Sequence, residues 1–247
     1  MIDTFLSTYN DRKKELNGFI DLLKFLEKKS NNRNESGISE FDTVFHNGED
    51  SISFTYQQLI NVLKSNASLM IYSIIEFTVA NLLESIYDEI KVRELSYIEV
   101  SDSIRRLWRE SILKAGRDPN ANFYTFLRKN EVVINAVVLG KIVEIKAKQT
   151  IPDGNLDGLT IQKTFAAHGI QIATNSDNYR PDLLESIKKS RNELAHGSVS
   201  FVDALRQKSI LDIGITSGIV ISFLDELIDL VQVYINEQKY AAGTKSY

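Results

Sequence analysis

The stretch SLMIYSIIEFTVANLLESIYDEI, residues 68–90, decides the class of fold. Its apolar residues lie on more than one side of an α-helix, and the same pattern extends over residues 55–89. A helix that is apolar on several faces is typical of the centre of a helical bundle, whereas a surface helix carries one apolar stripe. We therefore predict a long buried helix over residues 55–89, with other helices packed around it.

Several other segments have the spacing of helices that could surround this central one. A single apolar stripe runs along residues 3–29, as expected for a helix with one buried face. A second helix is expected after residue 101 or 102, because Ser101 and Asp102 are both suitable N-caps. After Val132 the chain is rich in Val and Ile, so helix and strand both remain open there. Further helices are expected over residues 160–168, ended by Gly169, over 182–196 and over 216–238.

Between these helices the sequence predicts irregular structure. The expected segments are a polar loop over residues 30–37, a weak strand or turn region over 42–55, a second loop over 173–181 and a frayed tail over 240–247. We predict an all-α bundle in a single domain, residues 1–247. Residues 1–50 supply the N-terminal helix and loop, and residues 91–180 form an inserted or connecting region that is partly irregular and partly helical.

Composition restricts the classes of protein that fit. The 247 residues suffice for a substantial core, and the net charge of −4 provides no global attraction to nucleic acid. Because the chain has no Cys, disulfides, thiolate metal sites and a Cys nucleophile are excluded. The apolar run 69–83 contains Glu76 and Asn81 and is short for a bilayer span, and the N-terminal stretch is amphipathic, unlike a signal peptide. We expect a cytoplasmic protein that does not enter a membrane.

Positive charge gathers in one part of this acidic chain. Residues 104–148 hold ten Lys and Arg against four Asp and Glu, a local charge of +6. Two interpretations remain open: an ordinary solvated basic face, or a phosphate-binding surface. In the second case Arg105, Arg106 and Arg109 are candidates for phosphate contact.

The segment SRNELAHG, residues 190–197, places polar side chains near the end of the helix expected over 182–196. At 100° per residue, Arg191 shares the apolar stripe of that helix, whereas Asn192 and His196 lie four apart on a neighbouring face. A buried guanidinium is costly unless it is paired or lines a cleft. Such an Arg is often only salt-bridged, and a His at a helix end is often a cap, so structural and catalytic roles both stay open.

The end of the same helix has features that suit acid–base chemistry. Gly197 suits a left-handed cap, so His196 would lie in the last turn, where the negative end of the helix dipole favours the imidazolium. Arg191 and His196 are about 140° apart on an ideal helix. They reach one phosphate only if the last turn distorts or a second subunit brings its own pair, so the motif predicts a dimer.

Arg191, four intervening residues and His196, with Asn192 directly after the Arg, resemble the Arg-x4–6-His signature of the HEPN superfamily of all-helical domains. The wider stretch LLESIKKSRNELAHGSVSF, residues 183–201, is similar to the version found in a HEPN branch associated with bacterial defence and restriction loci. The resemblance extends to the partner helix at 68–90, the connecting segment at 154–170 and the last helix, and covers about 55–90 and 150–238.

The resemblance implies a metal-independent endoribonuclease whose site is built across a homodimer. RNA is cut when its own 2′-OH attacks the adjacent phosphate, a reaction that needs proton transfer and positive charge beside the phosphorane. His196 suits the first task and Arg191 the second, while Asn192 could orient His196 or bind the phosphate. Glu76 could pair with Arg191 and fix it, with or without catalysis. The candidates for RNA contact are Arg105, Arg106, Arg109, Lys188 and Lys189.

This chemistry requires no metal ion and no cofactor, and we expect none. His46 and His168 have no companion His or carboxylate at ligand spacing, so we expect both to be structural or surface residues. A metal-dependent nuclease therefore fits the sequence poorly. None of the glycine-containing signatures of P-loop, dinucleotide-binding or α/β-hydrolase enzymes occurs in the chain.

Two classes of function stay open on this sequence. The first is an RNA-cleaving toxin or phage-defence effector. The second is a non-catalytic HEPN module that binds a nucleotide, RNA or a partner protein in a defence or toxin–antitoxin system. For both classes the expected partners are RNA, a second copy of the chain, and an antitoxin, nucleotidyltransferase or other defence-system protein. Cleavage of RNA without a metal ion separates the two classes.

Overall fold

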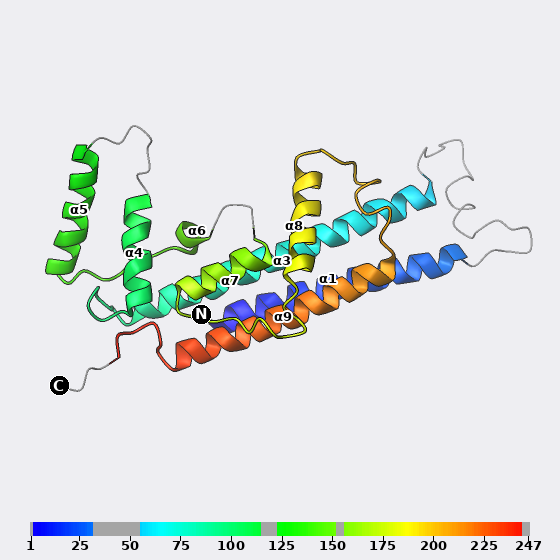
Figure 1. The fold of residues 1–247 in the computed structure, drawn as a ribbon. Coiled ribbons are helices and arrows are strands. Elements are labelled where there is room, and N and C mark those ends of the chain that lie inside the picture. Colours follow the sequence, from blue (N-terminus) through cyan, green and yellow to red (C-terminus); the bar gives the residue numbers. More distant parts are fainter. Residues whose placement is uncertain (1, 32–54, 115–122, 152–155, 244–247) are drawn as a thin grey trace, which may run out of the picture. The chain divides into compact units, whose positions relative to one another are not determined.

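A computed structural model describes residues 2–31, 55–114, 123–151 and 156–243 (Figure 1). This part of the chain contains eight α-helices and isolated bridges in place of β-strands, which confirms the predicted all-α class. The helices are α1 (Ile2–Asn31), α3 (Tyr56–Val92), α4 (Asp102–Lys114), α5 (Phe123–Val138), α6 (Ala147–Thr150), α7 (Gly158–Ala167), α8 (Pro181–Ala195) and α9 (Ile210–Asn236).

The chain divides into two compact units, each assembled from separate stretches of sequence. The first unit comprises Met1–Phe5, Phe77–Tyr179 and Phe223–Tyr247, and the second comprises Leu6–Glu76 and Arg180–Ser222. Helices α1, α3 and α9 contribute residues to both. The two units are therefore not two domains that follow one another along the chain. The single domain over residues 1–247 stays a prediction.

Helix α3 is the central buried helix that the sequence predicts. It begins after Thr55, whose hydroxyl accepts from the backbone N–H of Gln58 at 3.2 Å, while the Gln58 side chain accepts from the backbone N–H of Thr55 at 2.8 Å. This reciprocal capping satisfies two N–H groups that lack partners inside the helix. Farther along, Ile75 in the second unit and Leu82 and Ile86 in the first are fully buried.

Of the described helices, α3 alone has the length and composition that a membrane span needs. Its most apolar 18-residue window has a mean hydropathy of 1.4. More than half of that window, 56%, is buried inside the protein. Burial in the helical core therefore explains the apolar composition of α3.

Helix α9 begins six residues earlier than the sequence spacing predicts, at Ile210 and not at Thr216. The reason is a capping box. The backbone N–H of Ser209 donates to the Asp212 carboxylate at 3.0 Å, and the backbone N–H of Asp212 donates to the Ser209 hydroxyl at 3.0 Å. The added turn also buries Ile210 and Ile213, so packing supports the early start.

The tail after α9 is not frayed where the structure describes it, which corrects the prediction for residues 240–247. Tyr240 is fully buried, and its carbonyl accepts from the backbone N–H of Ser101 at 2.8 Å. Ala241 forms an isolated antiparallel bridge with Val100. These contacts are tertiary and leave no local pattern in the sequence. The last four residues, 244–247, lie outside the described part.

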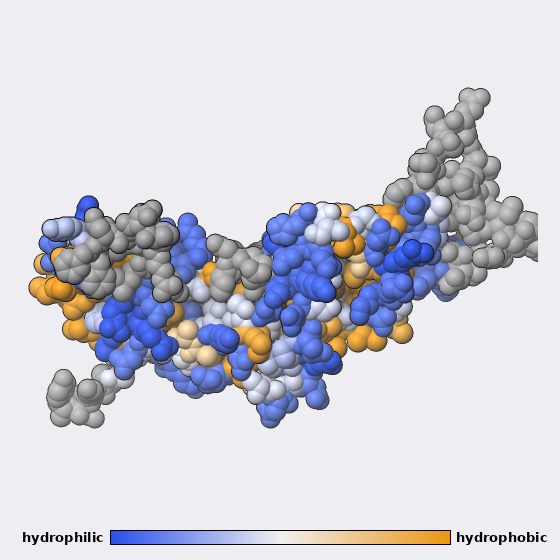
Figure 2. All heavy atoms as spheres, turned by 45° about the horizontal axis from the view of Figure 1, so that its top comes forward, coloured by the Kyte–Doolittle hydropathy of each residue, from blue (hydrophilic) through white to orange (hydrophobic). Residues whose placement is uncertain are grey.

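The middle region is largely helical. Helix α4 follows Ser101 as predicted, and its first turn also holds Asp102. The Val- and Ile-rich segment folds as helix α5, which decides between the two open alternatives, and Ile142 after it forms an isolated bridge with Ser96. Helix α5 exposes several apolar side chains, among them Val132, Ile134 and Val138, and orange spheres gather on the left of Figure 2, at the end where Figure 1 shows α5. The predicted loop and strand or turn region over 32–54, with His46, lie outside the described residues.

Candidate active site

The end of helix α8 has the geometry that the motif predicts. Gly197 adopts a φ of +68°, a left-handed conformation that favours glycine. The backbone N–H of Ser198 donates to the carbonyl of Glu193 at 3.0 Å, and that of Gly197 donates to Leu194 at 3.2 Å. This pair of bonds is a Schellman motif, which satisfies carbonyls at the helix end. The motif fixes the backbone of His196, the last residue before the turn.

Three groups hold the guanidinium of Arg191. One nitrogen donates to the side-chain oxygen of Asn192 at 3.0 Å, and another lies 3.8 Å from a carboxylate oxygen of Glu76 on α3. The guanidinium carbon also lies 5.1 Å from the ring centre of Tyr72, one turn before Glu76. The side chain of Arg191 is 29% exposed, so the apolar stripe of α8 places it at the edge of the core, paired as expected.

The contacts of Arg191 differ in strength. A cation over a shielded aromatic face gains about 0.5 to 2 kcal/mol, and Tyr72 is only 1% exposed. The Glu76 carboxylate is 38% exposed and its distance is long, so this ion pair contributes at most about 1 kcal/mol. A guanidinium carries five N–H donors, more than Asn192 and Glu76 accept here, so Arg191 retains the capacity to bind an anion.

The side chain of His196 is exposed, and no hydrogen bond among the described residues joins it to Arg191. The side-chain oxygen of Asn192 accepts from Arg191, and no hydrogen bond among the described residues joins the Asn192 side chain to His196. The angle of about 140° between the two positions on an ideal helix stays a prediction.

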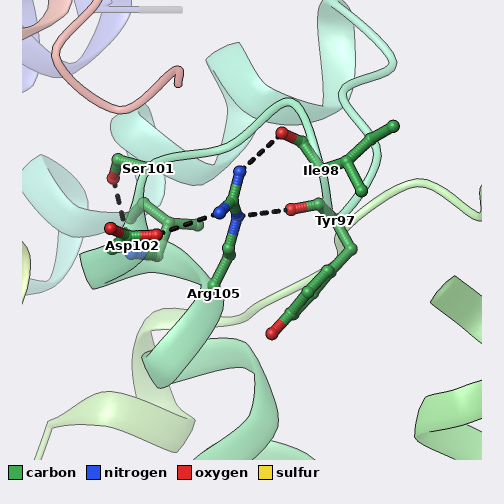
Figure 3. A network of polar contacts seen from close by, with 6 residues as sticks. Tyr97, Ile98, Ser101, Asp102 and Arg105 are labelled. Atoms are coloured by element: carbon green, nitrogen blue, oxygen red, sulfur yellow. Dashed lines mark hydrogen bonds and ion pairs between the residues drawn. The ribbon is translucent and has the colours of Figure 1, made fainter. Parts of the chain in front are cut away.

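The candidates on helix α4 lie in the other compact unit, and Arg105 has a structural task there. Its guanidinium donates to the carbonyls of Tyr97 and Ile98 at 2.8 Å and 2.6 Å and to the Asp102 carboxylate at 2.9 Å (Figure 3). These bonds hold the turn before α4. Arg109 is exposed, and Arg106 donates to a carbonyl at 3.5 Å.

The lysines beside the motif lie on α8 itself. Lys189 is exposed and forms a long ion pair with Glu193, at 3.9 Å. Lys188 is half-buried. Both belong to the same compact unit as Arg191 and His196, whereas the α4 arginines do not. Of the candidates for RNA contact, Lys188 and Lys189 are therefore the two that lie on the same helix as Arg191.

His168 is a buried structural residue, which is one of the two roles expected for it. Its Nδ1 lies 2.7 Å from the carbonyl of Thr164 and must donate to it, so Nε2 accepts from the hydroxyl of Tyr87 at 2.5 Å. Burial lowers the pKa of His168 to about 4. This histidine is therefore neutral at neutral pH, and the described residues hold it away from solvent.

Within the described ranges, no group of three His, Cys, Asp or Glu side chains is arranged to hold a metal ion. Sequence reasoning found the Arg191, Asn192, Glu76 and His196 positions but missed Tyr72. The spacing of Tyr72 and Glu76, four residues apart on one face of α3, was the signal available for it.

The all-α fold and the Arg-x4-His motif at the end of α8 define the class of HEPN domains. Within that class, the model of the MAE_28990-like HEPN family matches residues 1–240, and the chain belongs to this family. The match includes residues 1–50 and the basic region, which the resemblance in the motifs does not cover. No curated protein and no solved structure matches the chain.

Proposed function

We propose that this protein is a metal-independent endoribonuclease with Arg191 and His196 as its catalytic residues. HEPN domains are often ribonucleases or RNA-binding modules, and the family match supports either class. The observation that carries the proposal is the cradle of Arg191. Tyr72, Glu76 and Asn192 hold a half-exposed guanidinium beside the helix end that exposes His196.

The proposed chemistry uses the substrate's own nucleophile. The 2′-oxygen forms a bond to the adjacent phosphorus while the bond from phosphorus to the 5′-oxygen breaks. The proton leaves the 2′-OH, and another is delivered to the departing 5′-oxygen, so the products are a 2′,3′-cyclic phosphate and a 5′-OH. His196 manages these protons, and the guanidinium of Arg191 stabilises the phosphorane charge.

A composite site completes the proposal. Since an ideal helix places Arg191 and His196 about 140° apart, a second copy supplies the missing group, with the Arg191 of one subunit beside the His196 of the other. Homodimers with a two-fold axis would then carry two equivalent sites. A role as a toxin or phage-defence effector in the cytoplasm, restrained by an antitoxin, nucleotidyltransferase or other partner protein, belongs to the same proposal.

Cleavage of RNA in the presence of EDTA tests the proposal. We expect the purified protein to cut RNA under these conditions and to leave 2′,3′-cyclic phosphate ends. His196→Ala and Arg191→Ala should each lower the rate by at least about 100-fold, since each removes a group that acts in the transition state. Lys14→Ala, an exposed change on α1, is the control and should keep the wild-type rate.

The absence of a hydrogen bond between Arg191 and His196 among the described residues also favours a second candidate, a non-catalytic module that binds RNA, a nucleotide or a partner. In that case the protein binds its ligand and cuts RNA under no condition. Full cleavage by His196→Ala, or a rate that EDTA abolishes, contradicts the ribonuclease mechanism. Expression in a bacterial host adds a cellular measure: the wild type should slow growth, and the Arg191→Ala, His196→Ala double variant should not.

A further inference from the structure

A second guanidinium reaches the same stretch of helix α3 as Arg191. Arg12 on α1 donates to the hydroxyl of Ser73 at 3.5 Å. Ser73 lies three residues before Glu76, which pairs with Arg191, so the two α3 side chains are neighbours on the helix surface. All these residues belong to the second compact unit. The side chains of Arg12 and Arg191 therefore approach one short segment of α3 from two different helices.

The position of Arg12 follows from the packing of α1. Tyr9 and Leu16 are buried, and Arg12 lies three residues after the first and four before the second, at the edge of the buried face. Its side chain is half-exposed, and Ser73 is exposed. The helix anchors the base of the side chain while its charged end remains within reach of solvent.

The chemistry of this arrangement suits an extended polyanion. A guanidinium stays charged at any physiological pH and presents a rigid fork of donors that matches phosphate oxygens. The contact with the Ser73 hydroxyl directs the Arg12 side chain toward α3. On the same stretch of α3, Glu76 lies beside the guanidinium of Arg191.

We propose that Arg12 binds a second phosphate of the RNA whose scissile phosphate lies at Arg191. This inference rests on the proposed function and adds a binding residue to it. The RNA chain then passes over Ser73 and Glu76, which α3 leaves accessible to solvent between buried neighbours. Because Arg12 touches a phosphate that does not react, it binds ground state and transition state alike, and its loss raises KM while kcat stays near the wild-type value.

RNA binding by a cleavage-deficient protein tests the contact directly. The full chain carrying His196→Ala is titrated with a short fluorescein-labelled oligouridylate in EDTA over a range of salt concentrations. Adding Arg12→Gln should weaken binding roughly tenfold, since a hydrogen bond to a charged group is lost. The slope of log K against log salt should fall by about 0.7, the value for one phosphate contact on a single strand.

Lys14→Gln is the matched control. Lys14 lies two residues away on the opposite side of α1, is 79% exposed and contacts Asp11, and its loss changes the net charge as much as that of Arg12. We expect it to alter Kd less than about twofold. Equal losses from both variants, or an unchanged Kd and slope for Arg12→Gln, overturn the inference.

The remaining outcomes separate the inference from the proposed function. If the wild type cuts RNA but Arg12→Gln binds normally, the contact is wrong and the ribonuclease stands. If the wild type fails to cut but Arg12→Gln weakens binding, the contact stands in a binding module. Should Arg12→Gln fail to fold, Arg12→Lys decides: weaker binding than the parent supports the forked contact, and unchanged binding overturns it.

Discussion

Arg191 occupies a position where burial and charge pull in opposite directions. The apolar stripe of α8 draws its stem toward the core, while the guanidinium needs partners or water. Helical spacing predicts both the stripe and a paired Arg. It does not predict which aromatic face lies under the guanidinium, because Tyr72 belongs to a helix more than a hundred residues earlier. That contact depends on how α8 and α3 pack.

The face of the Tyr72 ring should matter for catalysis more than its hydroxyl. We expect Tyr72→Phe to keep kcat/KM within about threefold of the wild type, because the ring still lies against Arg191. Tyr72→Leu should lower kcat/KM by roughly tenfold, since an aliphatic side chain offers no negative face to the cation. Cleavage kinetics in EDTA measure both, with thermal unfolding to compare folding. Equal losses in the two variants would show that the ring face has no such role.

Helix ends determine where the candidate functional side chains lie. The end of α8 was predicted correctly, whereas the start of α9 was not. The end of α8 carries a glycine after a run of helix-forming residues, and this local signal predicts Gly197 correctly. The start of α9 carries an equally local signal, Ser209 and Asp212 three apart, which the apolar spacing alone overlooked. Capping residues predict the ends of a helix as well as apolar periodicity does, because a cap can extend a helix by a whole turn.

Two glycines allow the conformation at the end of α8 to be tested. A Cβ added at Gly197 or at Gly218 meets no atom within 4 Å, so only backbone conformation distinguishes them. Gly197→Ala should lower the free energy of unfolding by about 1 kcal/mol, because an L-residue disfavours a φ of +68°. Gly218→Ala, inside α9, should raise it by about 0.5 to 1 kcal/mol. Urea unfolding measures both, and stabilisation by Gly197→Ala would contradict the left-handed cap.

At the scale of the whole molecule, the proposed chemistry is a property of two chains. An ideal helix places Arg191 and His196 about 140° apart, so we expect neither side of the helix end alone to provide both charge stabilisation and proton transfer. A dimer in which each site takes one residue from each subunit removes the conflict. The dimer remains a proposal, and it predicts how mixed variants behave.

Mixing inactive variants should restore activity. When Arg191→Ala and His196→Ala proteins are unfolded together and refolded, half of the dimers are expected to be mixed, and each mixed dimer holds one complete site. Recovery of about a quarter of the wild-type rate is therefore expected. Each variant refolded alone is the control and should stay inactive. An absence of recovery, although mixed dimers form, would contradict a site that takes its Arg and His from different subunits.

Local chemistry in the sequence was enough for the class of fold and for the family-defining motif. Apolar residues on several faces of 68–90 predict a buried helix, and spacing places Arg191 and His196 on different faces of α8. These features depend on the helical period and on capping, which act over a few residues. The same is true of the all-α class, which the structure confirms.

Contacts between distant residues were decided by packing. The ring of Tyr72 under Arg191, the reach of Arg12 to Ser73 and the burial of Tyr240 each join segments far apart in the chain. The contacts of Arg105 are also not predictable from sequence patterns, because its bonds to backbone carbonyls depend on the shape of a turn and not on residue type. Side-chain identity limits what a residue can bind, but the partner it finds depends on which helices pack together, and helical periodicity carries no record of that choice.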